Sequence, residues 1–170
     1  FQSTLTDFGY LRKRWKDTTE EERLLGVSLT GIMDCPAIYN AKPETLQELR
    51  NVAIKTNKKL AEKLGINQST AVTCVKPSGT VSQLVDAASG IHARHNPYYV
   101  RTVRGDNKDP LTMFLKDKGI PAEPDFTAPD SVTVFSFPMK SPDNAVCRYD
   151  MGAIEQLELW KLYAIHWCEH

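Results

Sequence analysis

The stretch TAVTCVKPSGTVS, residues 70–82, decides the fold of this protein. Its first half, Thr70 to Val75, is rich in β-branched residues and predicts a buried strand. A Lys-Pro-Ser-Gly-Thr turn follows at 76–80, and the sequence after the turn has a helical character that stops at Gly90. A strand that passes through such a turn into a helix is typical of α/β proteins, and we predict that fold class.

Helices and strands alternate on either side of this stretch. The apolar segment LLGVSLTGI at 24–32 predicts another buried strand. Leucines at helical spacing predict a helix over 45–64, and Gly65 suits its C-terminal cap. Further helices are predicted from 17, over 110–118 and over 151–170, and further strands over 98–104 and 131–138, the last broken by Pro138. We predict mostly parallel strands in one domain, 1–170, without an internal boundary.

Composition excludes several classes of protein. Of 170 residues, 41% are hydrophobic and 25% are charged, which is ordinary for a globular domain. Lys plus Arg and Asp plus Glu both number 21, and this zero net charge disfavours direct binding of nucleic acid. No run of about 18 apolar residues would cross a membrane. The N-terminus lacks the apolar core of a signal peptide, so the expected location is the cytoplasm.

The cysteines show no pattern of a redox or zinc site. They are Cys35, Cys74, Cys147 and Cys168, with no C-x-x-C pair among them. We expect free thiols without a catalytic role, as is usual in a reducing compartment. Cys35 follows a predicted strand, where α/β proteins place reactive groups, but a small buried thiol is an equally open interpretation. Two histidines at 92 and 95 lack a third metal ligand, so no metal site is expected.

The turn is the strongest candidate for a binding site. Free backbone N–H groups at the start of a helix attract anions, and Gly79 lets the backbone approach a ligand closely. Ser78 and Thr80 add hydroxyl donors, so a phosphate would fit. The alternative is an ordinary helix cap, and the residues alone leave both interpretations open. A Walker loop is excluded because its pattern is absent.

Basic residues near the turn allow two interpretations. They are Lys76, His92, Arg94, His95, Arg101 and Arg104. They could form an anion-facing patch, or they could alternate outward along a solvated strand edge.

Several segments together resemble one known family. The order of five segments is similar to that of ribonucleotide reductase catalytic chains. The segments are Gly26 to Gly31, residues 73–82, residues 98–104 with the Asp109 that follows, the VFSFP segment, and the C-terminal residues 155–170. Val81 stands where the di-metal branch usually carries a second Ser or Thr. The chain therefore resembles the adenosylcobalamin-dependent branch more closely.

The resemblance implies a fold, a reaction and a site. The fold would be the C-terminal portion of a ten-stranded α/β barrel around a finger loop with a thiyl-radical cysteine. The enzyme would reduce ribonucleoside di- or triphosphates to deoxyribonucleotides for DNA synthesis, with adenosylcobalamin as cofactor and a thioredoxin-like dithiol as reductant. The substrate-phosphate contacts carried over are Pro77, Ser78, Gly79, Thr80 and Val81, the last through its backbone. Cobalamin contacts are expected to include the loop from Gly90 to His95.

The sequence departs from the family in one decisive way. The finger-loop motif N-x-C-x-E is missing, so no catalytic residue is assigned within 1–170. The final amphipathic pattern, 151–170, is still running where the sequence stops, which indicates a piece of a larger protein. Within this pattern, Trp160, Tyr163 and Trp167 are expected to face the core and Glu169 to lie on the solvated side of the helix. The expected partner is the upstream part of the reductase barrel, and the chain alone is expected to be inactive. Two alternatives are a non-catalytic nucleotide-binding or regulatory module and a fragment of a di-metal-dependent reductase.

Overall fold

The computed structural model describes the backbone of residues 1–170 and every side chain except that of Gln2. The chain divides into two compact units. The first unit comprises Phe1–Arg94 and Asn144–His170, and the second comprises His95–Asp143. Whether the two are parts of one domain, as predicted, stays a prediction. Within the part of the chain that the structure describes, no helix is long and apolar enough to cross a membrane.

The first unit consists mainly of helices. They are η1 (Gln2–Thr4), α1 (Lys13–Glu22), η2 (Ile32–Asp34), α2 (Pro36–Tyr39), α3 (Pro43–Leu64), α4 (Val81–Leu84) and α6 (Ala153–His166). The prediction for α3 is confirmed, and Gly65 caps it in the left-handed conformation with φ 64°. Helix α1 begins earlier than the predicted 17, because Lys13 pairs with Asp17 one turn further along, at 2.5 Å.

A short parallel pair of strands crosses this unit. Strand β1 (Val27–Ser28) pairs with β2 (Thr73–Cys74), Val27 opposite Thr73. The parallel direction was predicted correctly, but both strands are shorter than expected and β1 is exposed. The ladder ends because the Ser28 hydroxyl, rather than a backbone carbonyl, accepts the N–H of Lys76 at 3.0 Å.

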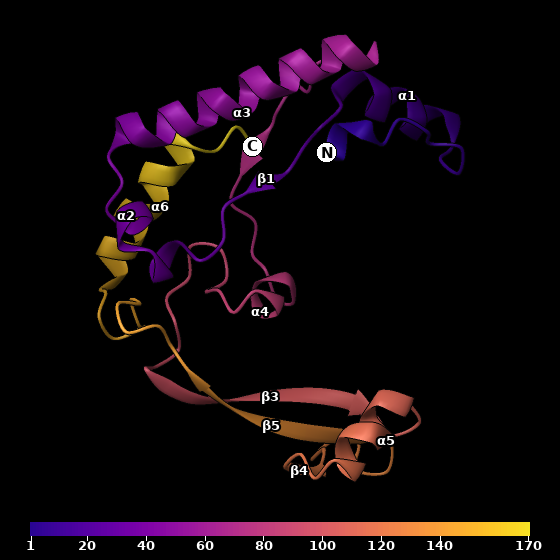
Figure 1. Cartoon of the computed structure of the whole chain (residues 1–170), viewed down its shortest axis with the longest axis vertical. Helices are drawn as coiled ribbons and strands as arrows, with labels where there is room; N and C mark the ends of the chain where they lie inside the picture. Colours follow the sequence, from indigo (N-terminus) through magenta and orange to yellow (C-terminus); the bar gives the residue numbers. More distant parts are fainter. The chain divides into compact units, whose positions relative to one another are not determined.

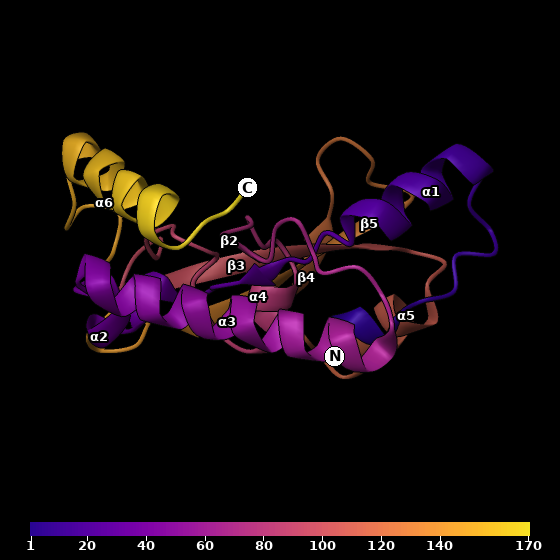
Figure 2. The same cartoon turned by 90° about the horizontal axis from the view of Figure 1, so that it is seen from above.

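Helix α6 carries the aromatic core of this unit. The C-terminal end of α6 lies beside the first half of α3 (Figures 1 and 2), where Gln47 Nε2 and His166 Nδ1 are 2.9 Å apart. Tyr163 and Trp167 are buried against Leu46, and the Tyr163 hydroxyl donates to the carbonyl of Ile38 at 2.8 Å. Trp160, also expected in the core, is exposed.

The prediction that the last helix runs to the end of the sequence was wrong. Helix α6 ends at His166, and the chain then lies along β2. Trp167 Nε1 donates to the carbonyl of Cys74 at 2.7 Å, and the Glu169 N–H donates to the carbonyl of Thr73 at 2.9 Å. The Glu169 contact satisfies the edge of β2 opposite to β1, which a continuing helix would leave unpaired.

The second unit is an antiparallel sheet with one helix. Its strands are β3 (Tyr98–Asp106), β4 (Ala122–Pro124) and β5 (Val132–Lys140), in the order β3-β5-β4, and its helix is α5 (Pro110–Asp117). Figure 1 shows β3 and β5 as the two long arrows. The prediction of mostly parallel pairing was wrong here, because both pairings in this sheet are antiparallel.

Of two predictions made for this unit from local sequence, one is confirmed and one was wrong. The prediction of a helix over 110–118 is confirmed, and its N-cap, Asp109, accepts the N–H of Leu111 at 2.9 Å. Pro138, expected to break the last strand, lies inside β5 opposite Val100. It is tolerated because β4 pairs only with Thr133–Phe135, so the missing N–H of Pro138 faces no strand.

Candidate phosphate site

The turn after β2 leads into a helix much shorter than expected. Helix α4 makes one turn and ends at Leu84, whereas the sequence predicted helical structure to about residue 88. The reason is Asp86, which takes a left-handed conformation with φ 46° and stops the helix. Four residues make only a small dipole, so the dipole argument for anion binding carries little weight. The remaining argument rests on the N–H groups, the hydroxyls and the open space around the turn.

Ser78 braces the turn from inside. Its Oγ accepts the N–H of Ser82 at 2.8 Å, and the Ser82 Oγ donates back to the carbonyl of Ser78 at 2.9 Å. The N–H of Ser78 itself donates to the Oγ of Ser89 at 2.9 Å. Ser82 is fully buried. The hydroxyl of Ser78 therefore orders the loop, as the helix-cap interpretation requires, and leaves the outer rim of the turn to other groups.

The outer rim borders a cavity of about 470 Å³. Lining residues come from the β1 segment and from the turn: Gly26, Ser28, Thr30, Lys76, Pro77, Ser78, Gly79, Thr80 and Val81. A Cβ atom added at Gly79 would meet no heavy atom within 4 Å, so there is room for a side chain at this position. All five residues predicted from the sequence thus lie around one cavity.

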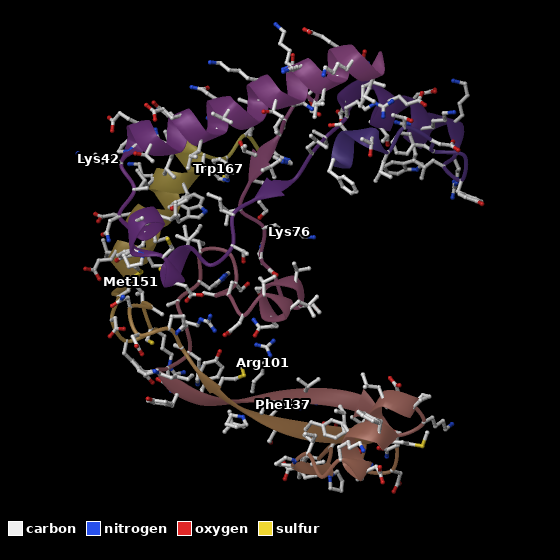
Figure 3. All side chains as sticks on the ribbon, viewed as in Figure 1. Lys42, Lys76, Arg101, Phe137, Met151 and Trp167 are labelled. Atoms are coloured by element: carbon white, nitrogen blue, oxygen red, sulfur yellow. The ribbon has the colours of Figure 1, made fainter. Side chains whose placement is uncertain are left out.

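The rim of this cavity carries donors and a positive charge. Thr80 and Val81 are exposed. Within residues 1–170, neither backbone N–H of these two residues donates to another group of the chain. Lys76 is exposed too (Figure 3), and no carboxylate that the structure describes pairs with it. Such an arrangement suits an oxyanion.

Two basic residues of the predicted patch, Arg94 and Arg104, pair with carboxylates within the fold. Arg94 is buried, with its side chain 3% exposed, and pairs with Asp34 at 2.8 Å, so it does not face an anion. Arg104 pairs with Asp125 at 2.7 Å inside the second unit. His95 and Arg101 also belong to that unit. Arg94 is therefore not part of an anion-facing patch, because its guanidinium is used within the fold.

Comparisons with known proteins decide the family. An adenosylcobalamin-dependent ribonucleoside-triphosphate reductase from Euglena gracilis is 29% identical over 162 residues, which are 92% of this chain and 22% of the relative. A reductase of the same name from Lactobacillus acidophilus is 35% identical over 105 residues, 61% of this chain and 14% of the relative. The chain belongs to the ribonucleotide reductase family. The resemblance predicted from the motifs, including the adenosylcobalamin-dependent branch, is confirmed.

The fold agrees with a solved ribonucleotide reductase. A crystal structure of a B-12 dependent, class II ribonucleotide reductase matches with a TM-score of 0.74 at 24% identity, over 91% of this chain and 26% of that one. This likeness supports the mixed α/β class. The chain spans about a fifth of the length of the curated relatives that it matches first. No protein-family model matches the chain.

The cysteines of this reductase segment are free thiols, as predicted. Cys35 is exposed, whereas Cys147 is buried and its backbone forms an isolated β-bridge with Arg94. Burial, followed by the nearby Asp150 carboxylate, raises the pKa of the Cys147 thiol. Burial also raises the pKa of Cys168. Among the residues that the structure describes, no cluster of three or more His, Cys, Asp or Glu could hold a metal ion.

Sequence reasoning missed four residues around the turn. They are Ser28, Asp34, Ser89 and Glu169. Glu169 was expected on a solvated helix face, but its Oε2 accepts the N–H of Val72 at 2.8 Å. Ser28 and Asp34 lie in the segment that resembles the family strand and its continuation, so their polar side chains beside glycines were a usable signal. No local sequence pattern predicted a role for Ser89, because its hydrogen-bond partner, Ser78, lies eleven residues away in the turn.

Proposed function

We propose that this chain is part of an adenosylcobalamin-dependent ribonucleotide reductase and supplies its substrate-phosphate turn. The observation that carries the proposal is the single cavity lined by all five residues of the predicted turn, with room beside Gly79 for a Cβ atom. The names of the relatives favour a ribonucleoside triphosphate over a diphosphate as substrate. Reduction of that substrate would supply deoxyribonucleotides for DNA synthesis.

Each residue of the turn has a distinct part in the proposed site. The backbone N–H groups of Thr80 and Val81 and the hydroxyl of Thr80 donate to phosphate oxygens. Gly79 lets the phosphate approach the main chain, since it adds no side chain to the cavity. Pro77 and Ser78 hold the turn in shape. Lys76 borders the same cavity and offsets the negative charge of the phosphates.

In this proposal the segment positions the substrate while the redox chemistry takes place on other residues. A thiyl-radical cysteine removes the 3′ hydrogen of the ribose, the 2′ hydroxyl leaves as water, and a cysteine pair supplies two electrons and becomes a disulfide. A thioredoxin-like dithiol then restores the pair. None of the four cysteines of this chain lies in an N-x-C-x-E motif, so the radical cysteine belongs to another part of the protein. The turn contributes by fixing the phosphates, which orients the ribose.

Part of the expected cofactor loop is occupied by contacts within the fold. When bound, adenosylcobalamin supplies the radical that starts the reaction. The loop from Gly90 to His95 was expected to contact it, but Gly90 and Arg94 are buried. The Arg94 guanidinium is bound to Asp34, and His92 Nδ1 lies 3.0 Å from the carbonyl of Ser89. Contact of this loop with cobalamin therefore stays a prediction, and Arg94 is not offered as one of the contacts.

The wider setting is also part of the proposal. The two units would form part of a ten-stranded α/β barrel, completed by the upstream portion of the reductase, and its sheet would continue from β1 and β2. Strand β1 is exposed and two residues long, which suits a strand whose surroundings are completed by further chain. The enzyme would work in the cytoplasm, where its dithiol reductant stays reduced.

The test is anaerobic turnover of the complete reductase. Deoxyribonucleoside triphosphate should form from the ribonucleotide only when adenosylcobalamin and a dithiol are both present. Formation of product without cobalamin would favour the di-metal alternative. Nucleotide binding without any turnover, in a folded and fully assembled protein, would favour the non-catalytic module.

A further inference from the structure

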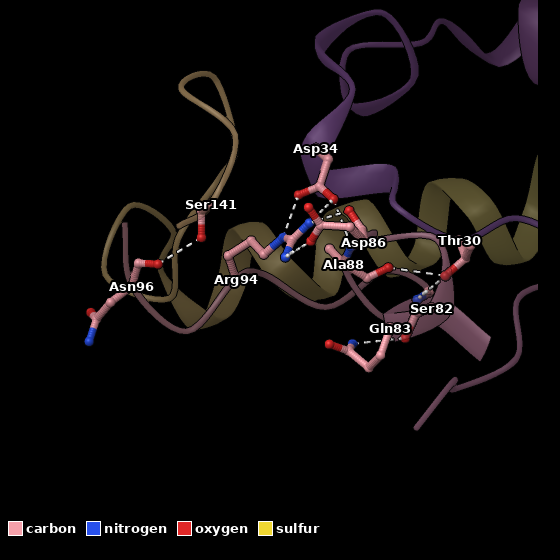
Figure 4. A network of polar contacts seen from close by, with 10 residues as sticks. Thr30, Asp34, Ser82, Gln83, Asp86, Ala88, Arg94, Asn96 and Ser141 are labelled. Carbon is pink, nitrogen blue, oxygen red and sulfur yellow. Dashed lines mark hydrogen bonds and ion pairs between the residues drawn. The ribbon is translucent and has the colours of Figure 1, made fainter. Parts of the chain in front are cut away.

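A buried ion pair lies behind the phosphate turn. Arg94 and Asp34 meet in two parallel hydrogen bonds, Nε to Oδ1 at 2.9 Å and Nη2 to Oδ2 at 2.8 Å (Figure 4). Their side chains are 3% and 13% exposed. This two-point geometry fixes the orientation of both groups as well as their separation.

The pair holds the loop that follows α4. Asp34 Oδ2 also accepts the N–H of Ala88 at 2.6 Å, and Arg94 Nη2 donates to the carbonyl of Asp86 at 2.8 Å. Asp86 is the left-handed residue that ends α4. From the other side, the Thr30 hydroxyl and the Gly31 N–H both donate to the carbonyl of Ala88, at 3.0 and 2.7 Å. Both polar groups of the Ala88 backbone are therefore held by the 30–34 segment.

The loop in turn holds the phosphate turn. Ser89, next to Ala88, accepts the N–H of Ser78 at 2.9 Å. The N–H of Ala87 donates to the carbonyl of Ser82, at 2.8 Å, and the Ser82 N–H donates to Ser78 Oγ. Two connections thus run from the buried pair to the residue just before Gly79.

We infer that Asp34 and Arg94 are positioning residues for the substrate phosphates. The inference rests on the proposed function of the turn and extends it to residues that do not touch the ligand. An apolar pair could fill the same space and stabilise the fold as well or better. It could not set the direction of the Ala88 N–H and the Asp86 carbonyl, and those directions determine where Ser89 meets the turn.

The test compares two ligands on the complete reductase. Equilibrium affinity is measured for a ribonucleoside triphosphate and for the same ribonucleoside without phosphates. Asp34→Asn should lower affinity for the triphosphate about tenfold, or about 1.4 kcal/mol, and change affinity for the nucleoside less than about twofold. A loss of fold alone would lower the active fraction and leave both affinities of the folded molecules unchanged.

Asp125→Asn is the matched control. Asp125 is also a buried carboxylate that accepts backbone N–H groups and an arginine, but it lies in the second unit. The Asp125→Asn variant should have the same affinity as the parent for both the triphosphate and the nucleoside. If Asp34→Asn does not fold, Ser89→Ala removes only the last link and should show the same selective loss.

Each outcome decides a separate question. Equal losses for nucleoside and triphosphate, or unchanged triphosphate affinity in folded Asp34→Asn or Ser89→Ala, would overturn the positioning role. If the unmodified protein binds the triphosphate no better than the nucleoside, the turn is not a phosphate site, and the proposed function itself is wrong.

Discussion

The hydroxyl oxygen of Ser89 accepts the backbone N–H of Ser78 at 2.9 Å. This contact uses the N–H of Ser78 within the fold and leaves the next amide groups of the turn at the rim of the cavity. It also explains why the turn at 76–80 is ordered although the helix after it, α4, is only four residues long. Ser78 is held from both sides, by Ser89 through its N–H and by Ser82 through its hydroxyl and carbonyl.

Gly79→Val should block the phosphate without harming the fold. The backbone of Gly79 does not lie in the left-handed region, and the space beside its Cα is open, so valine is accommodated in the absence of ligand. Its side chain would then project into the phosphate cavity. Affinity of the complete reductase for the triphosphate should fall at least about tenfold, or about 1.4 kcal/mol, in a titration at equilibrium.

Gly65→Val is the control for that substitution. Gly65 caps α3 with φ 64°, so valine there is strained and should lower the free energy of unfolding by about 1 kcal/mol. Nucleotide affinity should not change. Unchanged affinity in correctly folded Gly79→Val would remove the turn from the site.

The four cysteines should prove dispensable for turnover. Cys35, Cys74, Cys147 and Cys168 are each replaced by Ser or Ala, chosen by burial. Dithiol-dependent activity of the complete reductase should change by less than about tenfold, because none of these cysteines lies in a C-x-x-C pair or in the radical-cysteine motif N-x-C-x-E. If a single replacement stops turnover in a folded protein, that cysteine belongs to the redox machinery.

Thiol reactivity should follow burial and pH. Cys35 is exposed and should be alkylated first, as mass spectrometry of peptides would show. Cys147 should react last, because it is buried and its pKa is raised, which keeps it protonated near pH 8. Its rate should rise as the pH increases above 9 or when the protein is unfolded. Modification of Cys147 ahead of Cys35 in the native protein would contradict the fold described for this region.

Glu169 should stabilise the edge of β2. Its carboxylate accepts the N–H groups of Val72 and Thr73, at 2.8 and 3.2 Å, and Arg50 lies 3.8 Å away. Glu169→Ala leaves these two groups without an acceptor and should lower the free energy of unfolding by about 1–3 kcal/mol. Glu169→Gln keeps an acceptor and should cost less. Equal melting temperatures of the Ala variant and the parent would show that the segment after α6 does not pair with β2.

Asp125 should make the second unit sensitive to acid. A hydrogen bond from the Thr127 hydroxyl at 2.6 Å, followed by one from Arg104, holds the pKa of the Asp125 carboxyl well below its usual range. The unfolded chain binds this proton near pH 3.9, so the stabilisation is complete above about that pH and is lost as the pH falls further. Chemical unfolding of Asp125→Asn between pH 2 and 6 should therefore show a weaker pH dependence than the parent. An identical slope for the two proteins would exclude this carboxylate as the cause.

The sequence alone was sufficient for elements whose signals are local. Helix α3 ends at Leu64 before a left-handed Gly65, and α5 begins at Pro110 after its Asp109 cap, as predicted. These ends depend on hydrogen bonds between residues close in sequence, which a local pattern reveals. The order of the family motifs likewise identified the family from the sequence, and the cavity brings the five predicted turn residues together.

The tertiary structure decided what depends on residues far apart. Arg94 was predicted as a candidate for anion binding, but in the structure it pairs with Asp34, sixty residues away. Glu169 was predicted on a solvated helix face, but in the structure it lies beside β2 and accepts the N–H of Val72. A sequence pattern records which side chains can bind, whereas the partner that each finds depends on the path of the backbone. The antiparallel pairing of β3 and β5 has the same origin, because strand direction follows from the connection and not from the composition of the strand.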